Sequence, residues 1–174
     1  IINNKLSLYF TEKLFKKYPI VDLLEENKDS LYVALKNFGV VILGRNNTHT
    51  NFFLTNRIML PNMQINDLAS NSKGSIYAAT SNGVAVIKNE KVVKLLTGKN
   101  GLFNKFINKI FFLNEGTIFF LSNGSGFFIY RPDYFLTFNK KSGLPHNNVW
   151  AIKQLWNGDF CFLTDEGTAI MHKN

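Results

Sequence analysis

The chain has 174 residues, of which 45% are hydrophobic and 18% charged, a composition typical of a globular domain and not of a disordered tail. Its single cysteine, Cys161, excludes a disulfide framework and a cysteine-based zinc site. The net charge of +8 comes from lysines dispersed along the chain, so we expect a solvated basic surface and no nucleic-acid site. No apolar run approaches the roughly 18 residues of a membrane span.

Short apolar runs separated by turns follow one another along the chain. Residues 6–10 form the first run, and the apolar spacing of residues 11–18 favours a helical turn or two. From residue 29 onwards, runs of four to six residues alternate with turns that contain Gly, Asn or Asp, which is the pattern of strands and hairpins. The second run of each group lacks polar alternation, so we expect it to be buried on both faces.

A period of 42 residues relates these groups. The segment 101–110 is matched at 59–68 and again at 143–152. The run that begins at Gly74 is matched at Gly116 and Gly158 by the same offset, and an earlier copy, shifted by 45 residues, begins at Asp29. Each copy is followed by a turn that contains glycine. The chain therefore consists of four structural repeats.

Four strands in about 42 residues are the unit of a β-propeller blade. We predict an all-β fold, a single partial β-propeller over residues 1–174, with about four four-stranded antiparallel blades at 18–58, 59–100, 101–142 and 143–174. The last copy lacks its fourth strand, and residues 6–10 resemble a spare one. Either the two ends close one ring, or the chain is a segment of a larger propeller. We favour the segment, whose open blade faces predict self-association with other blades or a second copy.

The phrase at 143–152 and the residues after it resemble the two-component regulator propeller repeat. That repeat reads approximately GLP-x-N-x-V-x-x-I, then DG-x-L-W-I-G-T and a glycine turn; the second part corresponds here to Asn157, Gly158, Thr164 and Gly167. The resemblance covers residues 59–174 well and 20–45 more loosely. The tryptophan of the family's second strand is replaced by Tyr32, Tyr77, Phe119 and Cys161.

Such repeats form the periplasmic sensor region of membrane-bound hybrid two-component systems, whose ligands are typically oligosaccharides. The resemblance therefore implies a ligand-sensing segment that recognises an oligosaccharide in the periplasm and signals to a histidine kinase outside this chain. It implies contact with the membrane only through other parts of the parent protein. The alternative is a structural or protein-docking propeller without a small-molecule ligand.

No catalytic or metal-binding constellation accompanies the repeat. The sequence contains three histidines, His49, His146 and His172. None of them is spaced from a Ser, a Cys or an acidic residue as in a known catalytic motif. Cys161 lies between two phenylalanines, which favours a buried, inert thiol. We therefore expect no enzymatic activity, no metal and no cofactor.

The loops that lead into the first strand of each blade are the predicted ligand-binding region, together with the turns between second and third strands. In a propeller these loops and turns lie at the same end. Their amides and imidazole offer both donors and acceptors to hydroxyl-rich sugars. The candidate ligand-binding residues are Asn62, Gln64, Asn104, Lys105, His146, Asn147, Asn148 and Trp150, to which the turns add Asn37, Asn82, Asn123, Asp165 and Glu166. Turn geometry is the alternative explanation for Asn147 and Asn148, and packing in an inner strand is the alternative for Trp150.

Overall fold

The computed structural model describes residues 13–45, 52–103, 106–114, 116–131 and 134–173, and these residues form four antiparallel sheets. We call the sheets blades 1 to 4 in chain order. In each blade the strands follow one another in sequence order, each pairing with the next. Among the described residues, blades 1 to 3 have four strands and blade 4 has three, which confirms the prediction of an all-β fold built from propeller blades.

The strands are short and end at the predicted turns. Blade 1 contains β1 (Ile20–Asn27), β2 (Ser30–Leu35), β3 (Gly39–Gly44) and β4 (Phe53–Met59); blade 2 contains β5 (Ile65–Ser70), β6 (Ile76–Thr80), β7 (Gly83–Lys88) and β8 (Lys91–Leu96). Blade 3 contains β9 (Ile107–Asn114), β10 (Thr117–Ser122), β11 (Phe127–Arg131) and β12 (Tyr134–Phe138); blade 4 contains β13 (Val149–Gln154), β14 (Phe160–Thr164) and β15 (Gly167–Met171).

Three short helices complete the described secondary structure. The helix α1 (Lys13–Lys17) precedes blade 1 and lies within the segment expected to form a helical turn. Two 3₁₀ turns, η1 (Gly98–Asn100) and η2 (Lys140–Ser142), connect blades 2 and 3 and blades 3 and 4. None of these helices has the length and apolar character that crossing a membrane requires. Residues 6–10, the spare strand of the sequence analysis, lie outside the described residues.

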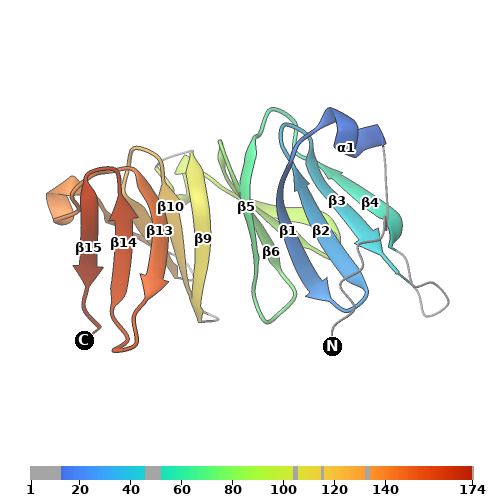
Figure 1. The fold of residues 1–174 in the computed structure, drawn as a ribbon. Coiled ribbons are helices and arrows are strands. Elements are labelled where there is room, and N and C mark those ends of the chain that lie inside the picture. Colours follow the sequence, from blue (N-terminus) through green and yellow to red (C-terminus); the bar gives the residue numbers. More distant parts are fainter. Residues whose placement is uncertain (1–12, 46–51, 104–105, 115, 132–133, 174) are drawn as a thin grey trace, which may run out of the picture.

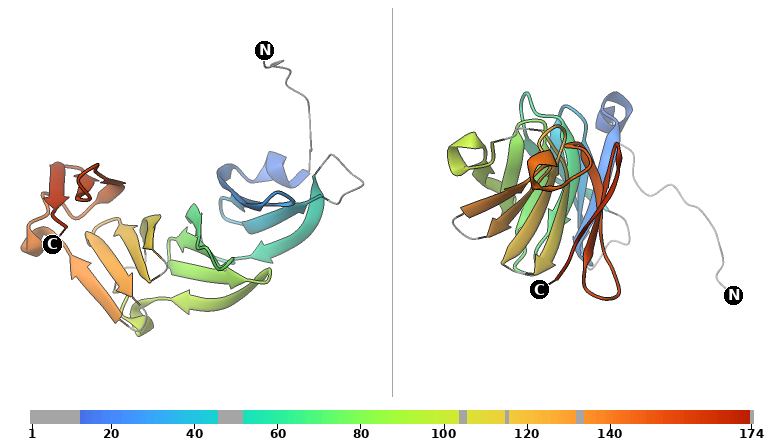
Figure 2. Two further views of the ribbon diagram at one scale, coloured as in Figure 1. Left: turned by 90° about the horizontal axis from the view of Figure 1, so that it is seen from below. Right: turned by 90° about the vertical axis from the view of Figure 1, so that its left-hand side faces the viewer.

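The four blades stand side by side in an open arc (Figures 1 and 2). Blade 1 and α1 lie at one end of the arc, and β15 lies at the other. The turns between second and third strands, such as the one between β14 and β15, lie at the upper end of the blades in Figure 1, and the hairpin turn between β1 and β2 lies at the lower end. We call these the upper and the lower end.

Apolar side chains between successive blades form the core. Each of the three blade interfaces contains its own buried cluster, and a fourth cluster lies on the outer face of blade 1, where Leu14 and Phe15 pack against it. The interface of blades 3 and 4 is largely aromatic: Phe127 stacks on Phe162 with the ring centroids 4.1 Å apart. Because a blade is covered on both faces, its middle strands can be apolar throughout.

Blade 4 departs from this expectation of two buried faces. Leu163 of β14 is 49% exposed, and Cys161, expected to be buried, is only partly so. Both residues lie on the face of β14 turned away from blade 3, opposite to the buried Phe160 and Phe162. No described sheet covers that face, which explains its exposure.

Hydrogen bonds between the inner strands, which are the first strand of each blade, join successive blades. Every inner strand has a bulge at its second residue, which takes that residue out of the ladder. In blade 2 this residue is Asn66, whose amide donates to the carbonyl of Ile107 in blade 3 at 2.7 Å. In blade 3 it is Asn108, whose amide donates to the carbonyl of Val149 in blade 4 at 3.1 Å. The two contacts are 42 residues apart and therefore belong to the repeat.

Two aspartates make further links beside these bulges. The carboxylate of Asp22 accepts the backbone N–H of Leu68 in the next blade, and Asp67 accepts that of Ile110, both at 2.8 Å. Asp67 is buried and also binds Lys109 Nζ at 2.8 Å. Its burial raises the pKa of Asp67, while the hydrogen bonds from Lys109 and Ile110 oppose that rise.

Two glycines in one turn provide a test of how closely β11 and β12 pack. Gly124 and Gly126 both have positive φ angles, +95° and +81°. A Cβ at Gly126 would lie 1.8 Å from the carbonyl oxygen of Phe138, whereas a Cβ at Gly124 meets nothing within 4 Å. We expect Gly124→Ala to cost about 1 kcal/mol of unfolding free energy, from the left-handed conformation alone. Gly126→Ala should cost about 3 kcal/mol or more, since the backbone must also shift.

Urea unfolding followed by circular dichroism measures both variants. Equal destabilisation by the two substitutions would show that the close approach of Gly126 to β12 does not exist in solution.

Candidate functional site

A polar hollow of about 400 Å³ lies at the upper end between blades 1 and 2. Its lining comes from the three segments that the repeat places there: Asn37 from the turn between β2 and β3, the loop before β5, and Ser81 from the turn between β6 and β7. The loop contributes Asn62, Met63 and Gln64. The sequence-predicted residues Asn62 and Gln64 are thus brought together in one hollow.

Backbone geometry fixes this lining. Gln64 and Ser81 are joined twice: the N–H of Gln64 donates to Ser81 Oγ at 3.0 Å, and the N–H of Ser81 donates to the carbonyl of Gln64 at 2.9 Å. The side chain of Gln64 donates to Asn66 Oδ1 at 3.2 Å. Asn37 and Asn62 both have a φ of 60°, a conformation that asparagine tolerates well. Turn geometry therefore explains the residue type at these two positions, and their amides still line the hollow.

A second group of predicted residues contacts Asp165 at the upper end of blade 4. Asp165 lies in the turn between β14 and β15, and its carboxylate accepts hydrogen bonds from Asn148 Nδ2 at 2.6 Å and from Trp150 Nε1. His146 Nδ1 lies 3.4 Å from the same carboxylate and accepts the backbone N–H of Asn148 at 3.1 Å. Three of the eight candidates, His146, Asn148 and Trp150, therefore surround one acid.

Asn147, the remaining candidate in this loop, contacts neighbouring segments and not Asp165. Its side-chain oxygen accepts the backbone N–H of Lys140 at 2.8 Å, and its carbonyl accepts the N–H of Gly126 at 2.6 Å. Lys140 Nζ in turn lies 3.3 Å from Glu166 Oε2. The polar groups of Asn147 thus hold its loop against two neighbouring segments. Asn147 does not have a positive φ, so this packing role differs from the turn geometry considered in the sequence analysis.

Trp150 occupies the bulge position that Asn66 and Asn108 occupy in blades 2 and 3. Those two asparagines reach the next blade, whereas the indole N–H of Trp150 reaches Asp165 within its own blade. Its side chain is 46% exposed, so the packing role considered in the sequence analysis accounts for only part of its surface. A rigidly held, half-exposed indole can offer its face to a ligand.

Among the described residues, no three His, Cys, Asp or Glu side chains are grouped so that they could hold a metal ion. The hollow and the residues around Asp165 together present amide, hydroxyl, carboxylate and indole groups at one end of the blades. Such a surface is suited to hydrogen bonding and stacking.

The hydrogen bonds to Asp165 set its titration. The hydrogen bonds that Trp150 and Asn148 donate hold the pKa of Asp165 below its ordinary 3.8. A carboxylate whose pKa is lowered by folding stabilises the fold above 3.8 and loses that contribution as the pH falls through the folded-state pKa. We therefore expect the surroundings of the Trp150 indole to change only below about pH 4.

Fluorescence of a Trp156→Ala chain measures this, because Trp150 is then its single tryptophan. Asp165→Asn should remove the transition at low pH. A Trp150 emission that still shifts there in the Asp165→Asn chain would assign the transition to another group.

The remaining candidates and the residues that the prediction missed complete the site. Asn104 and Lys105 lie outside the described residues. The hollow and the Asp165 group lie at the same end but in different blades, so the six candidates that the structure describes do not form one pocket. Sequence reasoning missed Ser81 and Met63 as lining residues, although the position of Ser81 directly after a buried second strand was available as a signal.

No protein-family model matches the chain, and no curated protein matches its sequence. Solved structures do resemble it. The extracellular domain of the putative hybrid two-component system BT3049 from B. thetaiotaomicron matches with a TM-score of 0.77 and 19% identity, over 97% of this chain and 23% of that one. The extracellular domain of the putative one-component system BT4673 from the same organism matches with a TM-score of 0.65 and 14% identity, over 87% and 20%.

The likeness extends to a more distant propeller. The WD40 β-propeller domain of Doa1 matches with a TM-score of 0.51 and 12% identity, over 83% of this chain and 79% of that one. This chain spans about a quarter of the length of the BT3049 domain. The chain therefore shares its fold with these extracellular domains and with the WD40 β-propeller domain, in agreement with the propeller repeat identified in its sequence.

Proposed function

We propose that this chain is a ligand-binding segment of a periplasmic sensor of the hybrid two-component type. In this proposal it recognises an oligosaccharide, does not transform it, and passes the state of the site to a histidine kinase outside the chain. The shared fold with extracellular sensor domains supports the sensor role.

The observation that carries the oligosaccharide proposal is the Trp150 site. The indole is half exposed, and its N–H is fixed by Asp165. Fixed aromatic faces beside polar groups suit sugars, because a sugar ring has an apolar face and a rim of hydroxyl groups. His146 and Asn148 supply hydrogen-bonding groups around the same acid.

The hollow at blades 1 and 2 extends the polar surface along the arc. Its amides and the Ser81 hydroxyl offer both donors and acceptors. Because the hollow and the Trp150 site belong to different blades, we expect a ligand of several sugar units to be preferred over a monosaccharide.

Isothermal titration of the chain with a panel of oligosaccharides tests the proposal. The panel includes neutral and sulfated members, since the chain carries a net charge of +8. We expect heat of binding with at least one of them, and chromatography of the recovered ligand should show it unchanged. No heat with any member would contradict oligosaccharide recognition and favour the alternative of a structural or protein-docking propeller. A shortened ligand in the chromatogram would contradict the non-enzymatic role.

A further inference from the structure

Uncharged side chains line the hollow between blades 1 and 2. Its described lining consists of Asn37, Asn62, Met63, Gln64 and Ser81. Lys36 precedes Asn37 in the chain and is exposed, but it is not part of this lining. Amide, hydroxyl and thioether groups do not titrate in the range in which proteins fold, so the described lining is neutral at any working pH.

The amides of Asn37 and Asn62 are available to a ligand. Both residues are exposed, and within the part of the chain that the structure describes neither side chain makes a hydrogen bond. Each amide offers two N–H donors and one carbonyl acceptor. The φ of 60° at both positions explains why asparagine is tolerated there, and it leaves these amide groups unused.

Gln64 and Ser81 are held by hydrogen bonds that use only part of their capacity. Ser81 Oγ accepts the backbone N–H of Gln64, so its own O–H can still donate. Gln64 Nε2 donates to Asn66 Oδ1, which leaves Gln64 Oε1 to accept. Asn66 is fixed in turn, because its Nδ2 donates to the carbonyl of Ile107 at 2.7 Å. The hollow therefore presents donors and acceptors together, and part of them in a fixed orientation.

Met63 supplies the apolar part of the lining. It is partly buried and packs against the core cluster between blades 1 and 2. A sugar ring has an apolar face of C–H groups beside its hydroxyl groups, and a flexible thioether side chain adapts its shape to such a surface. The lining thus matches both kinds of surface that a neutral sugar presents.

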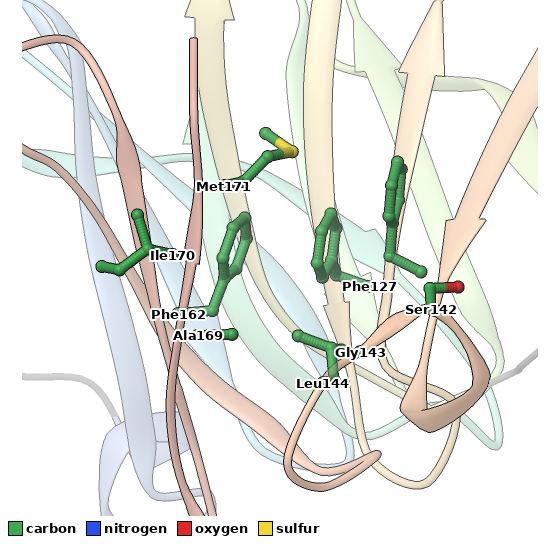
Figure 3. Close-up of a pocket in the computed structure, with 9 residues that line it drawn as sticks. Phe127, Ser142, Gly143, Leu144, Phe162, Ala169, Ile170 and Met171 are labelled. Atoms are coloured by element: carbon green, nitrogen blue, oxygen red, sulfur yellow. The ribbon is translucent and has the colours of Figure 1, made fainter.

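The cavity between blades 3 and 4 has a different lining (Figure 3). It measures about 150 Å³, and the only hydroxyl or amide side chain in its described lining is Ser142. Phe127 and Phe162 lie beside each other there, with their ring centroids 4.1 Å apart. Packing of one blade on the next therefore does not by itself produce a polar cavity. The polar lining of the hollow comes from the particular residues of its loop and turns.

A sulfate or carboxylate group fits this lining poorly. A charged group that leaves water needs an opposite charge to offset the loss of its hydration. Arg and Lys are the side chains that bind such anions most strongly, and no described Arg or Lys lines the hollow. A sugar hydroxyl carries no charge and both donates and accepts, and the hollow has partners for both functions.

We propose that the hollow binds an uncharged sugar unit through the amides of Asn37 and Asn62 and the hydroxyl of Ser81, and thereby selects neutral oligosaccharides over sulfated or uronic ones. This inference rests on the proposed function, to which it adds the class of ligand. The net charge of +8 would by itself favour anionic ligands, but no described residue brings that charge into the hollow.

Isothermal titration with matched pairs of ligands tests the proposal. The probes are linear hexasaccharides of glucose, mannose, xylose and galactose, each in its neutral form and in a chemically sulfated form. We expect at least one neutral hexasaccharide to bind, and its sulfated form to bind more weakly by about tenfold or more, since the anion meets no cation in the hollow.

Three variants assign the preference to the hollow. Asn62→Gly removes one amide while glycine accepts the φ of 60°, and it should weaken neutral binding about fivefold, the value of one neutral hydrogen bond. Asn89→Gly is the matched control and should leave the affinity unchanged. Asn89 also has a positive φ, 48°, and it follows β7, whereas Ser81 precedes that strand. Gln64→Lys places a cation in the hollow and should reduce the preference for the neutral form about tenfold.

A sulfated form that binds more tightly than its neutral partner, or less than tenfold more weakly, would overturn the proposal and leave oligosaccharide recognition intact. Neutral binding that Asn62→Gly does not weaken, or a preference that Gln64→Lys does not change, would show that the ligand lies outside the hollow. The absence of heat with every member of both series would contradict the proposed function itself, and this inference with it.

Discussion

Replacing Trp150 with alanine is expected to weaken oligosaccharide binding by about tenfold or more, which corresponds to about 1.4 kcal/mol. The substitution removes the half-exposed indole face and leaves the hydrogen-bonding oxygen of Asp165 without its aromatic donor. Aromatic residues at the centre of a binding surface often cost this much or more when truncated. Isothermal titration with the best ligand of the panel measures the loss.

The chain offers a matched control in its other tryptophan. Trp156 is fully exposed and lies in the hairpin turn between β13 and β14, at the lower end of the blades. Trp156→Ala should leave the affinity within twofold of the unmodified chain. If Trp156→Ala weakened binding and Trp150→Ala did not, the ligand would bind at the lower end.

Replacing Phe119 with alanine is expected to lower the unfolding free energy by about 3–5 kcal/mol. Phe119 of β10 is 1% exposed and lies in the centre of the interface between blades 3 and 4. Its ring contacts Phe160 at 5.1 Å, and Phe127 and Phe162 at 6.0 Å each. The substitution leaves a cavity that these rigid rings fill poorly, and the loss is a large part of the stability of a typical domain.

Urea unfolding monitored by circular dichroism measures this loss, and Phe103→Ala provides the control. Phe103 is 82% exposed in the loop before β9, so its truncation should change stability by no more than about 0.5 kcal/mol. A Phe119→Ala chain within 1 kcal/mol of the unmodified protein would contradict the packing of blade 3 on blade 4.

The blades were predictable because the repeat and the turns are local in sequence. Glycine and asparagine mark where each strand ends, and apolar runs mark strands covered on both faces, as β10 is. The exposure of Leu163 and the partial exposure of Cys161 were not predictable from their own neighbourhood in sequence. Both residues belong to a strand with the apolar pattern of a buried one, and their exposure depends on which sheets surround blade 4.

The candidate site was predictable at the level of loops and only in part at the level of contacts. The repeat predicted that Asn62, Gln64, His146 and Asn148 lie at one end of the blades, and they do, because loops of equivalent position share one end. The contact between Trp150 and Asp165 joins residues fifteen positions apart across two strands and a bulge. No property of either residue type alone indicates that contact. The role of Asn147 in holding Lys140 likewise depends on how two loops meet.

Hydrogen exchange of the chain with and without its best oligosaccharide tests most directly whether the upper end of the blades is the ligand face. We expect protection in the segments 60–65, 144–150 and 165–167, which contain the hollow and the Trp150 site, and unchanged exchange in the lower hairpin turns at 71–74 and 155–158. Protection confined to the lower turns, or spread evenly over both ends, would contradict the proposed site.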